Sequence, residues 1–113
     1  MHEYTVTENV LRIALEKAGE AEASRVTQIN LVVGDLSGAV PECIQFYFDS
    51  FSKNTIAEGA VLHFDRVQAQ LRCRSCSTPF QPENGIWDCP ACHSQGIEVV
   101  GGRDLYIESM EIE

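Results

Sequence analysis

The feature that most constrains this chain is a set of four cysteines arranged in two close pairs. Cys73 and Cys76 form the first C-x2-C pair and, after twelve residues, Cys89 and Cys92 form the second. Structural zinc takes four ligands in a tetrahedron, and two tight C-x2-C turns can present two thiolates each. Between the pairs, Glu83-Asn-Gly has the composition of a turn between two short strands. The spacing therefore predicts a four-thiolate zinc site in a ribbon module.

These could also be four unrelated cysteines, but chance seldom produces two C-x2-C pairs at this distance. Two alternatives to zinc remain. Two disulfides are disfavoured because the N-terminal residues lack the basic start and apolar core of a secretory signal, so we expect a reducing cytoplasm. Iron in a rubredoxin-like site is the other alternative, but Gly usually follows each pair there, whereas Ser77 and His93 stand here. A closed thiolate site builds structure and performs no chemistry, so zinc is expected to supply about 10 kcal/mol of the ribbon's folding free energy.

The charge of the chain disfavours nucleic acid as a partner. The formal net charge is −9 over 113 residues, and nucleic-acid binding depends on clustered Lys and Arg. Arg66, Arg72 and Arg74 do lie near the first cysteine pair, but the ribbon has no Lys. A zinc-ribbon interaction module in transcription or nucleic-acid machinery is therefore the alternative function. The longest apolar runs are far shorter than the ~20 residues that span a bilayer, so no membrane partner is expected.

Two segments have the apolar spacing of amphipathic helices. The first extends from about residues 4–6 to about residues 21–23, and Thr5 with Glu8 has the pattern of a capping box at its start. The second is expected to begin at Pro41 and to end before residue 55. Its expected core face comprises Ile44, Phe48 and Phe51. Cys43, in its first turn, is expected to be a small buried side chain.

Three segments have the composition of strands. Residues 26–33 form the first, which Gly34 closes, and residues 61–72 form the second, with an alternation slip near Asp65-Arg66 that indicates a bulge or hinge. After the ribbon, Gly101-Gly102 has the composition of a flexible joint, and a last strand runs from residue 105 to residue 112. Because that strand lies beyond the joint, we expect it to return to the first sheet.

The expected fold is therefore α+β, with a small mixed sheet, two helices and an inserted zinc-ribbon module. The α/β domain would comprise residues 1–66, completed by the C-terminal strand 103–113, and the zinc-ribbon domain would comprise residues 67–102.

The first residues form a second candidate metal site. Bulky His2 is expected to block removal of Met1, because methionine aminopeptidases need a small second residue. The Met1 amine, the His2 backbone amide and the His2 Nδ1 can then chelate one ion in fused rings. Such nitrogen ligands suit square-planar Ni²⁺ or Cu²⁺, and the Glu3 amide or an outside ligand can fill the fourth position.

Taken together, these features resemble the HypA/HybF family, the nickel metallochaperones of [NiFe]-hydrogenase maturation. The specific part is the Met1-His2-Glu3 start combined with the C-x2-C-x12-C-P-x-C module. The resemblance extends to residues 34–42 and 57–60. It implies that Met1, His2 and Glu3 bind nickel, and that Cys73, Cys76, Cys89 and Cys92 bind zinc. His93 is a candidate auxiliary ligand, although Ser77 departs from members that carry His after both pairs.

The resemblance also implies a role and partners. Zn(II) would be structural and Ni(II) would be cargo, delivered with a maturation GTPase, often called HypB, to the [NiFe]-hydrogenase large-subunit precursor, and in some organisms to urease maturation. We expect a cytoplasmic monomer or weak homodimer. No catalytic residues are expected, because the sequence has neither a nucleophile–base pair nor a phosphate-binding loop.

Overall fold

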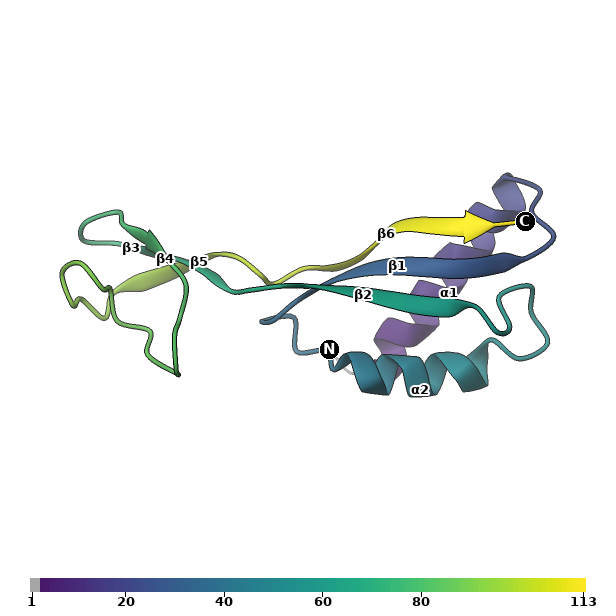
Figure 1. Ribbon diagram of the computed structural model, residues 1–113, viewed down its shortest axis with the longest axis horizontal. Coiled ribbons are helices and arrows are strands. Elements are labelled where there is room, and N and C mark those ends of the chain that lie inside the picture. Colours follow the sequence, from purple (N-terminus) through teal and green to yellow (C-terminus); the bar gives the residue numbers. More distant parts are fainter. Residues whose placement is uncertain (1–2) are drawn as a thin grey trace.

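The computed structural model describes residues 3–113, which form an elongated body of 55 × 24 × 17 Å (Figure 1). In chain order the elements are α1 (Glu3–Glu20), β1 (Val26–Gly34), α2 (Pro41–Phe51), β2 (Val61–Val67), β3 (Gln70–Cys73), β4 (Pro79–Phe80), β5 (Ile97–Gly101) and β6 (Leu105–Ile112). None of the helices in this part of the chain combines the length and hydropathy that a bilayer span requires.

The larger half of the molecule is a mixed three-stranded sheet with two helices on one face (Figure 1). Its strand order is β2-β1-β6, with β2 parallel and β6 antiparallel to the central β1. Parallel neighbours need a crossover connection, and α2 lies in the segment that connects β1 to β2. The expected α+β class with two helices is thus confirmed, and β6 returns to the first sheet. The exact domain boundaries, 1–66 with 103–113 and 67–102, stay a prediction.

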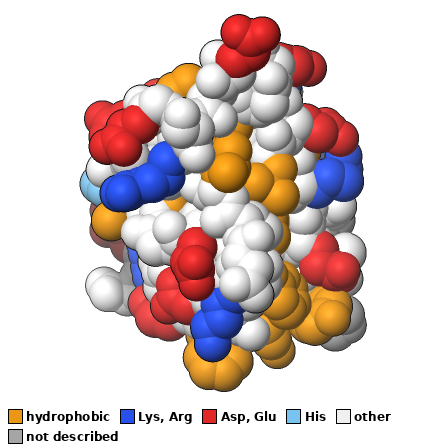
Figure 2. Space-filling view, turned by 90° about the vertical axis from the view of Figure 1, so that its right-hand side faces the viewer, with side chains coloured by type: hydrophobic (Ala, Val, Ile, Leu, Met, Phe, Trp, Pro, Cys, Tyr) orange, Lys and Arg blue, Asp and Glu red, His pale blue; other side chains and the backbone are white. Residues whose placement is uncertain are grey.

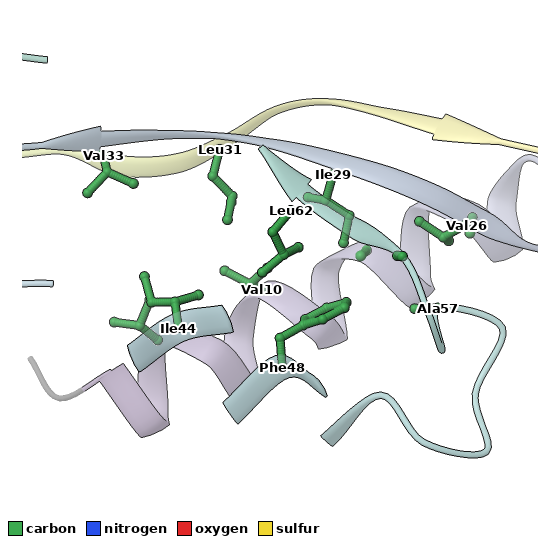
Figure 3. Packing of buried hydrophobic residues seen from close by; sticks show 13 residues of the cluster. Val10, Val26, Ile29, Leu31, Val33, Ile44, Phe48, Ala57 and Leu62 are labelled. Carbon is green, nitrogen blue, oxygen red and sulfur yellow. The ribbon is translucent and has the colours of Figure 1, made fainter. Parts of the chain in front are cut away.

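The core lies between the two helices and the inner face of this sheet (Figure 3). Ile29 and Leu31 from β1 meet Ile44 and Phe48 from α2, and all four side chains are fully buried. Burying a side chain of this size contributes about 1.5–3 kcal/mol relative to exposure. The core therefore holds α1 and α2 in fixed positions, including the start of α1 next to the N-terminal residues.

Two local expectations for the helices are wrong. Thr5 lies inside α1, which begins at Glu3, so Thr5 and Glu8 do not form a capping box. Cys43 is exposed and not a buried side chain. The buried face of α2 includes Ile44, and position 43 is rotated by roughly 100° from it because a helix has about 3.6 residues per turn.

The connection between the two sheets is a close crossing of backbones and not a flexible joint at Gly101-Gly102. A Cβ atom on Gly34 would lie 2.2 Å from the Gly102 carbonyl oxygen, and one on Gly102 would lie 2.8 Å from the Ala69 Cα. Gly102 also has a φ of +90°, which favours glycine. The Leu36 N–H donates to the Gly102 carbonyl at 2.7 Å and the Gly34 N–H to the Asp104 carbonyl at 2.8 Å. Close packing and hydrogen bonds therefore fix this segment.

The expected second strand is interrupted at this crossing. β2 ends at Val67 and β3 begins at Gln70, so the break lies after the expected slip at Asp65-Arg66. The Val67 carbonyl accepts a hydrogen bond from the Asp35 N–H at 2.8 Å, which ties the end of β2 to the loop after β1. Beyond the break, β3 is the centre of a second, antiparallel sheet of order β4-β3-β5 that carries the cysteines.

Candidate metal centre

Two backbone turns of the same design present the four cysteines. In the first, the Ser77 N–H donates to the Cys73 carbonyl at 2.9 Å, and in the second the His93 N–H donates to the Cys89 carbonyl at 2.8 Å. Ser77 and His93 have φ values of 63° and 61°, so both adopt the left-handed conformation. Gly is common at such a position because it adopts positive φ without strain, whereas other residues incur about 1–2 kcal/mol. The absence of Gly after each pair is therefore compatible with this turn.

The four sulfur atoms gather at one end of the second sheet. Cys73 Sγ lies 3.5 Å from Cys92 Sγ, and Cys76 Sγ lies 3.6 Å from Cys89 Sγ. All four sulfurs lie within 4.8 Å of one another. A tetrahedral zinc ion with Zn–S bonds of about 2.3 Å separates its sulfurs by about 3.8 Å. The spacing and the thiol chemistry of the cluster therefore fit a tetrahedral metal ion such as zinc.

Three thiols of the cluster differ in acidity. The pKa of Cys76 is lowered to about 6, first by the Thr78 hydroxyl 3.0 Å away and then by the Thr78 backbone N–H. The pKa of Cys73 is lowered, mainly by the Cys76 backbone N–H. The Ser94 backbone N–H lowers the pKa of Cys92, but the Cys73 thiol and desolvation outweigh it and raise that pKa to about 12. A metal ion must therefore displace a proton from Cys92.

His93 lies beside this cluster without belonging to it. Among the described residues, the set of close metal-ligating groups comprises the four cysteines alone. His93 is exposed and lines an open hollow of the ribbon with Phe80, Ile86 and Pro90. Its role as an auxiliary ligand stays a prediction. His63 is exposed on β2.

Of the expected nickel ligands, Met1 and His2 lie outside the described residues, whereas Glu3 is described. The Glu3 Oε1 accepts a hydrogen bond from the Val40 N–H at 3.2 Å. Val40 is the N-cap residue of α2, and its own side chain makes no capping hydrogen bond. Glu3 therefore ties the first residue of α1 to the beginning of α2. No sequence pattern indicated this contact, because the two residues are 37 positions apart.

An aromatic groove between α1 and α2 was also missed by sequence reasoning. Its lining comprises Tyr4, Glu8, Leu11, Arg12, Leu15, Glu16 and Phe51. The Tyr4 ring centroid lies 4.9 Å from that of Phe51 and 5.5 Å from that of Tyr47. Phe46 is 71% exposed on the same helix as Phe51. Figure 2 shows hydrophobic side chains gathered at the lower border of the molecule, where α2 lies in Figure 1.

Comparison with known proteins gives consistent results over the whole chain. A family model described as "Hydrogenase/urease nickel incorporation, metallochaperone, hypA" matches residues 1–112. The chain is 41% identical over 113 residues to hydrogenase maturation factor HypA of Dehalococcoides mccartyi (strain CBDB1), covering all of this chain and 95% of that protein. It is 41% identical over 113 residues to hydrogenase maturation factor HypA of Geobacter sulfurreducens, covering 100% of both.

Solved structures agree with these matches in fold. The solution structure of the Ni metallochaperone HypA from Helicobacter pylori superposes with a TM-score of 0.69 at 24% identity, covering 99% of this chain and 97% of that one. A second solution structure, of a HypA protein, gives a TM-score of 0.73 at 22% identity, covering 98% and 95%. Because the family model and the sequence relatives match along the full length, the chain belongs to the HypA family of hydrogenase and urease nickel-incorporation metallochaperones.

Proposed function

We propose that this chain is a non-enzymatic carrier that takes up Ni(II) at Met1-His2-Glu3 and delivers it to the [NiFe]-hydrogenase large-subunit precursor. Family membership supports the role in nickel incorporation. The structural observation that carries the proposed binding site is the start of α1 at Glu3. The first N–H groups of a helix have no intrahelical acceptor, so the Glu3 amide is not committed to helix hydrogen bonds.

The chemistry of the proposed site follows from this position. The Met1 amine, the His2 amide, the His2 Nδ1 and the Glu3 amide would give four nitrogen donors, a set that suits square-planar Ni²⁺. The positive end of the α1 macrodipole stabilises negative charge, so it favours the deprotonated amide nitrogens. The Glu3 carboxylate already accepts the Val40 N–H, so we assign it the role of positioning the start of α1 and not that of a ligand.

Calorimetric nickel titration of zinc-loaded protein with a native N-terminus tests this site. His2→Ala is expected to abolish specific binding, and acetylation of the Met1 amine is expected to do the same. His63→Ala is the matched control, because His63 is an exposed histidine on β2. His93→Ala tests the auxiliary ligand in the same assay. Unchanged nickel affinity in His2→Ala would contradict the proposal, whereas a loss in His93→Ala would extend the site to the ribbon.

We assign structural Zn(II) to Cys73, Cys76, Cys89 and Cys92. The ribbon has little apolar side-chain burial apart from β3, since Ile86 is 61% exposed and Trp87 38% exposed. Metal binding is therefore proposed to provide most of its stability. Thiols that hold metal require a reducing compartment, which supports the cytoplasm as the proposed location.

The proposed delivery step also needs a partner that drives release. We assign the docking of a maturation GTPase to the aromatic groove between α1 and α2. Aromatic anchors such as Tyr4 and Phe51 are typical of binding hot spots, and Glu8 in the groove would attract basic groups on the partner. Glu8→Lys should weaken GTPase binding, and Glu58→Lys, an exposed charge change in the turn before β2, should not. Equal affinity in both variants would place the docking surface elsewhere.

A further inference from the structure

The outer edge of β6 is an open strand edge. β6 pairs only with β1, and it forms the upper border of the sheet in Figure 1. The Asp104 carbonyl accepts the Gly34 N–H, and the register continues with Leu105 opposite Val33 and Ile107 opposite Leu31. Antiparallel ladders alternate between hydrogen-bonded and non-hydrogen-bonded pairs. The N–H and C=O groups of Leu105 and Ile107 therefore face away from β1, toward the open edge.

A groove of about 290 Å³ adjoins this edge. It lies between β6, the first half of α1 and the loop after β1. Its apolar lining comprises Val6, Val10, Ile13, Ala39, Leu105 and Ile107. Ile13, an apolar residue of α1, remains 36% exposed. The volume is at the lower limit of ligand pockets, about 300–1,000 Å³, so the groove suits one or two side chains.

The polar end of the groove carries a single positive charge. Arg103 is the one charged residue among those that line it, and Asn9, Ser37 and Tyr106 are the other residues with polar groups in their side chains. Arg103 forms none of the ion pairs within 4.0 Å found in residues 3–113. The chain has a net charge of −9, so an unpaired arginine next to an apolar groove distinguishes this site. It would attract a carboxylate to the end of β6 where Arg103 lies.

The direction of β6 determines which carboxylate would reach Arg103. Arg103 precedes Leu105, the first residue of β6. A strand that adds antiparallel to β6 runs in the opposite direction, so its C-terminal end lies beside Arg103. Addition of an extended peptide to a sheet edge, with alternate side chains in a neighbouring pocket, is a common mode of peptide recognition.

We propose that the β6 edge and this groove bind the C-terminal tail of a partner protein as an added antiparallel strand. The tail forms backbone hydrogen bonds with Leu105 and Ile107, places one apolar side chain in the groove, and pairs its terminal carboxylate with Arg103. A second copy of this chain fits the edge poorly, because Glu108 and Glu111 of two antiparallel β6 strands would repel each other. The site goes beyond nickel binding and GTPase docking and does not depend on either.

Fluorescence anisotropy on zinc-loaded full-length protein tests the proposal. The probes are an array of fluorescein-labelled eight-residue peptides that end in Val, Ile, Leu or Phe, each made with a free C-terminal carboxylate and as its amide. We expect saturable binding of carboxylate peptides and a loss of about tenfold or more in affinity on amidation, since charge-assisted hydrogen bonds are the strong ones. Arg103→Gln should cause a similar loss and remove the difference between the paired peptides. Arg74→Gln, an exposed arginine of the ribbon, is the matched control.

Hydrogen exchange measured by NMR provides the structural readout. Bound peptide should slow exchange of the Leu105 and Ile107 amides, and methylation of the peptide backbone nitrogens should abolish this protection. Three outcomes would overturn the proposal: no peptide of the array binds, the amides bind as tightly as the carboxylates, or the protein alone is a dimer that protects these two amides.

Discussion

The backbone crossing at Gly34 allows a sharp test of what holds the sheet and the ribbon together. Gly34→Ala places a Cβ atom 2.2 Å from the Gly102 carbonyl oxygen and 2.4 Å from its carbon. Both contacts are with backbone atoms, so the two backbone segments must move apart by about an ångström to remove the overlap. Overpacking of this kind costs about 1–3 kcal/mol. The movement also weakens the Leu36–Gly102 and Gly34–Asp104 hydrogen bonds, each worth about 1 kcal/mol.

The expected loss of unfolding free energy is therefore about 3–5 kcal/mol, a large part of the 5–15 kcal/mol typical of a domain. At about 4–8 °C per kcal/mol for a domain of this size, the melting temperature should fall by more than about 10 °C. Circular dichroism during heating and urea unfolding measures both quantities. Gly19→Ala is the matched control, because its Cβ meets nothing within 4 Å. A Gly34→Ala melting temperature within about 3 °C of the unmodified protein would refute the reasoning.

Three further outcomes follow from the same structure. Chelation of zinc, or Cys76→Ser, should unfold residues 72–101 and leave the α/β part folded, and dispersed NMR signals of the ribbon after chelation would contradict this. Zinc binding at pH 7.5 should release protons, because Cys92, with a pKa of about 12, is then protonated, whereas Cys76, with a pKa of about 6, contributes few. Calorimetry in buffers of different ionisation enthalpy counts these protons, and zinc affinity should fall as the pH is lowered. Phe48→Ala, at a fully buried core position, should lower the unfolding free energy by about 3–5 kcal/mol in urea unfolding, and a loss below about 1 kcal/mol would contradict the core assignment.

Features encoded by neighbouring residues could be predicted from the sequence. The start of α2 at Pro41 and the bounds of β6 at Leu105 and Ile112 match the expectations. The cysteine cluster could also be predicted, because the spacing within each C-x2-C pair determines how its sulfurs can be presented. These successes share a cause, which is that proline geometry, alternation and ligand spacing act over a few residues.

Contacts between distant residues could not be predicted in this way. The Glu3–Val40 hydrogen bond and the Gly34–Gly102 crossing join segments that only the tertiary fold brings together. Gly101-Gly102 suggested flexibility because glycine has a wide choice of backbone conformations. In the structure, Gly102 adopts a positive φ and its backbone packs closely against those of Gly34 and Ala69. The exposure of Cys43 depends on which face of α2 meets the sheet, and a lone cysteine in a first turn does not reveal that.

The central claim is that nickel and zinc occupy separate sites with different ligands. Nickel-edge X-ray absorption of protein loaded with one zinc and one nickel per chain tests it most directly. We predict that nickel has nitrogen ligands that include one imidazole, from His2, and no sulfur ligand. A sulfur shell around nickel would place the ion among Cys73, Cys76, Cys89 and Cys92, and would contradict the account.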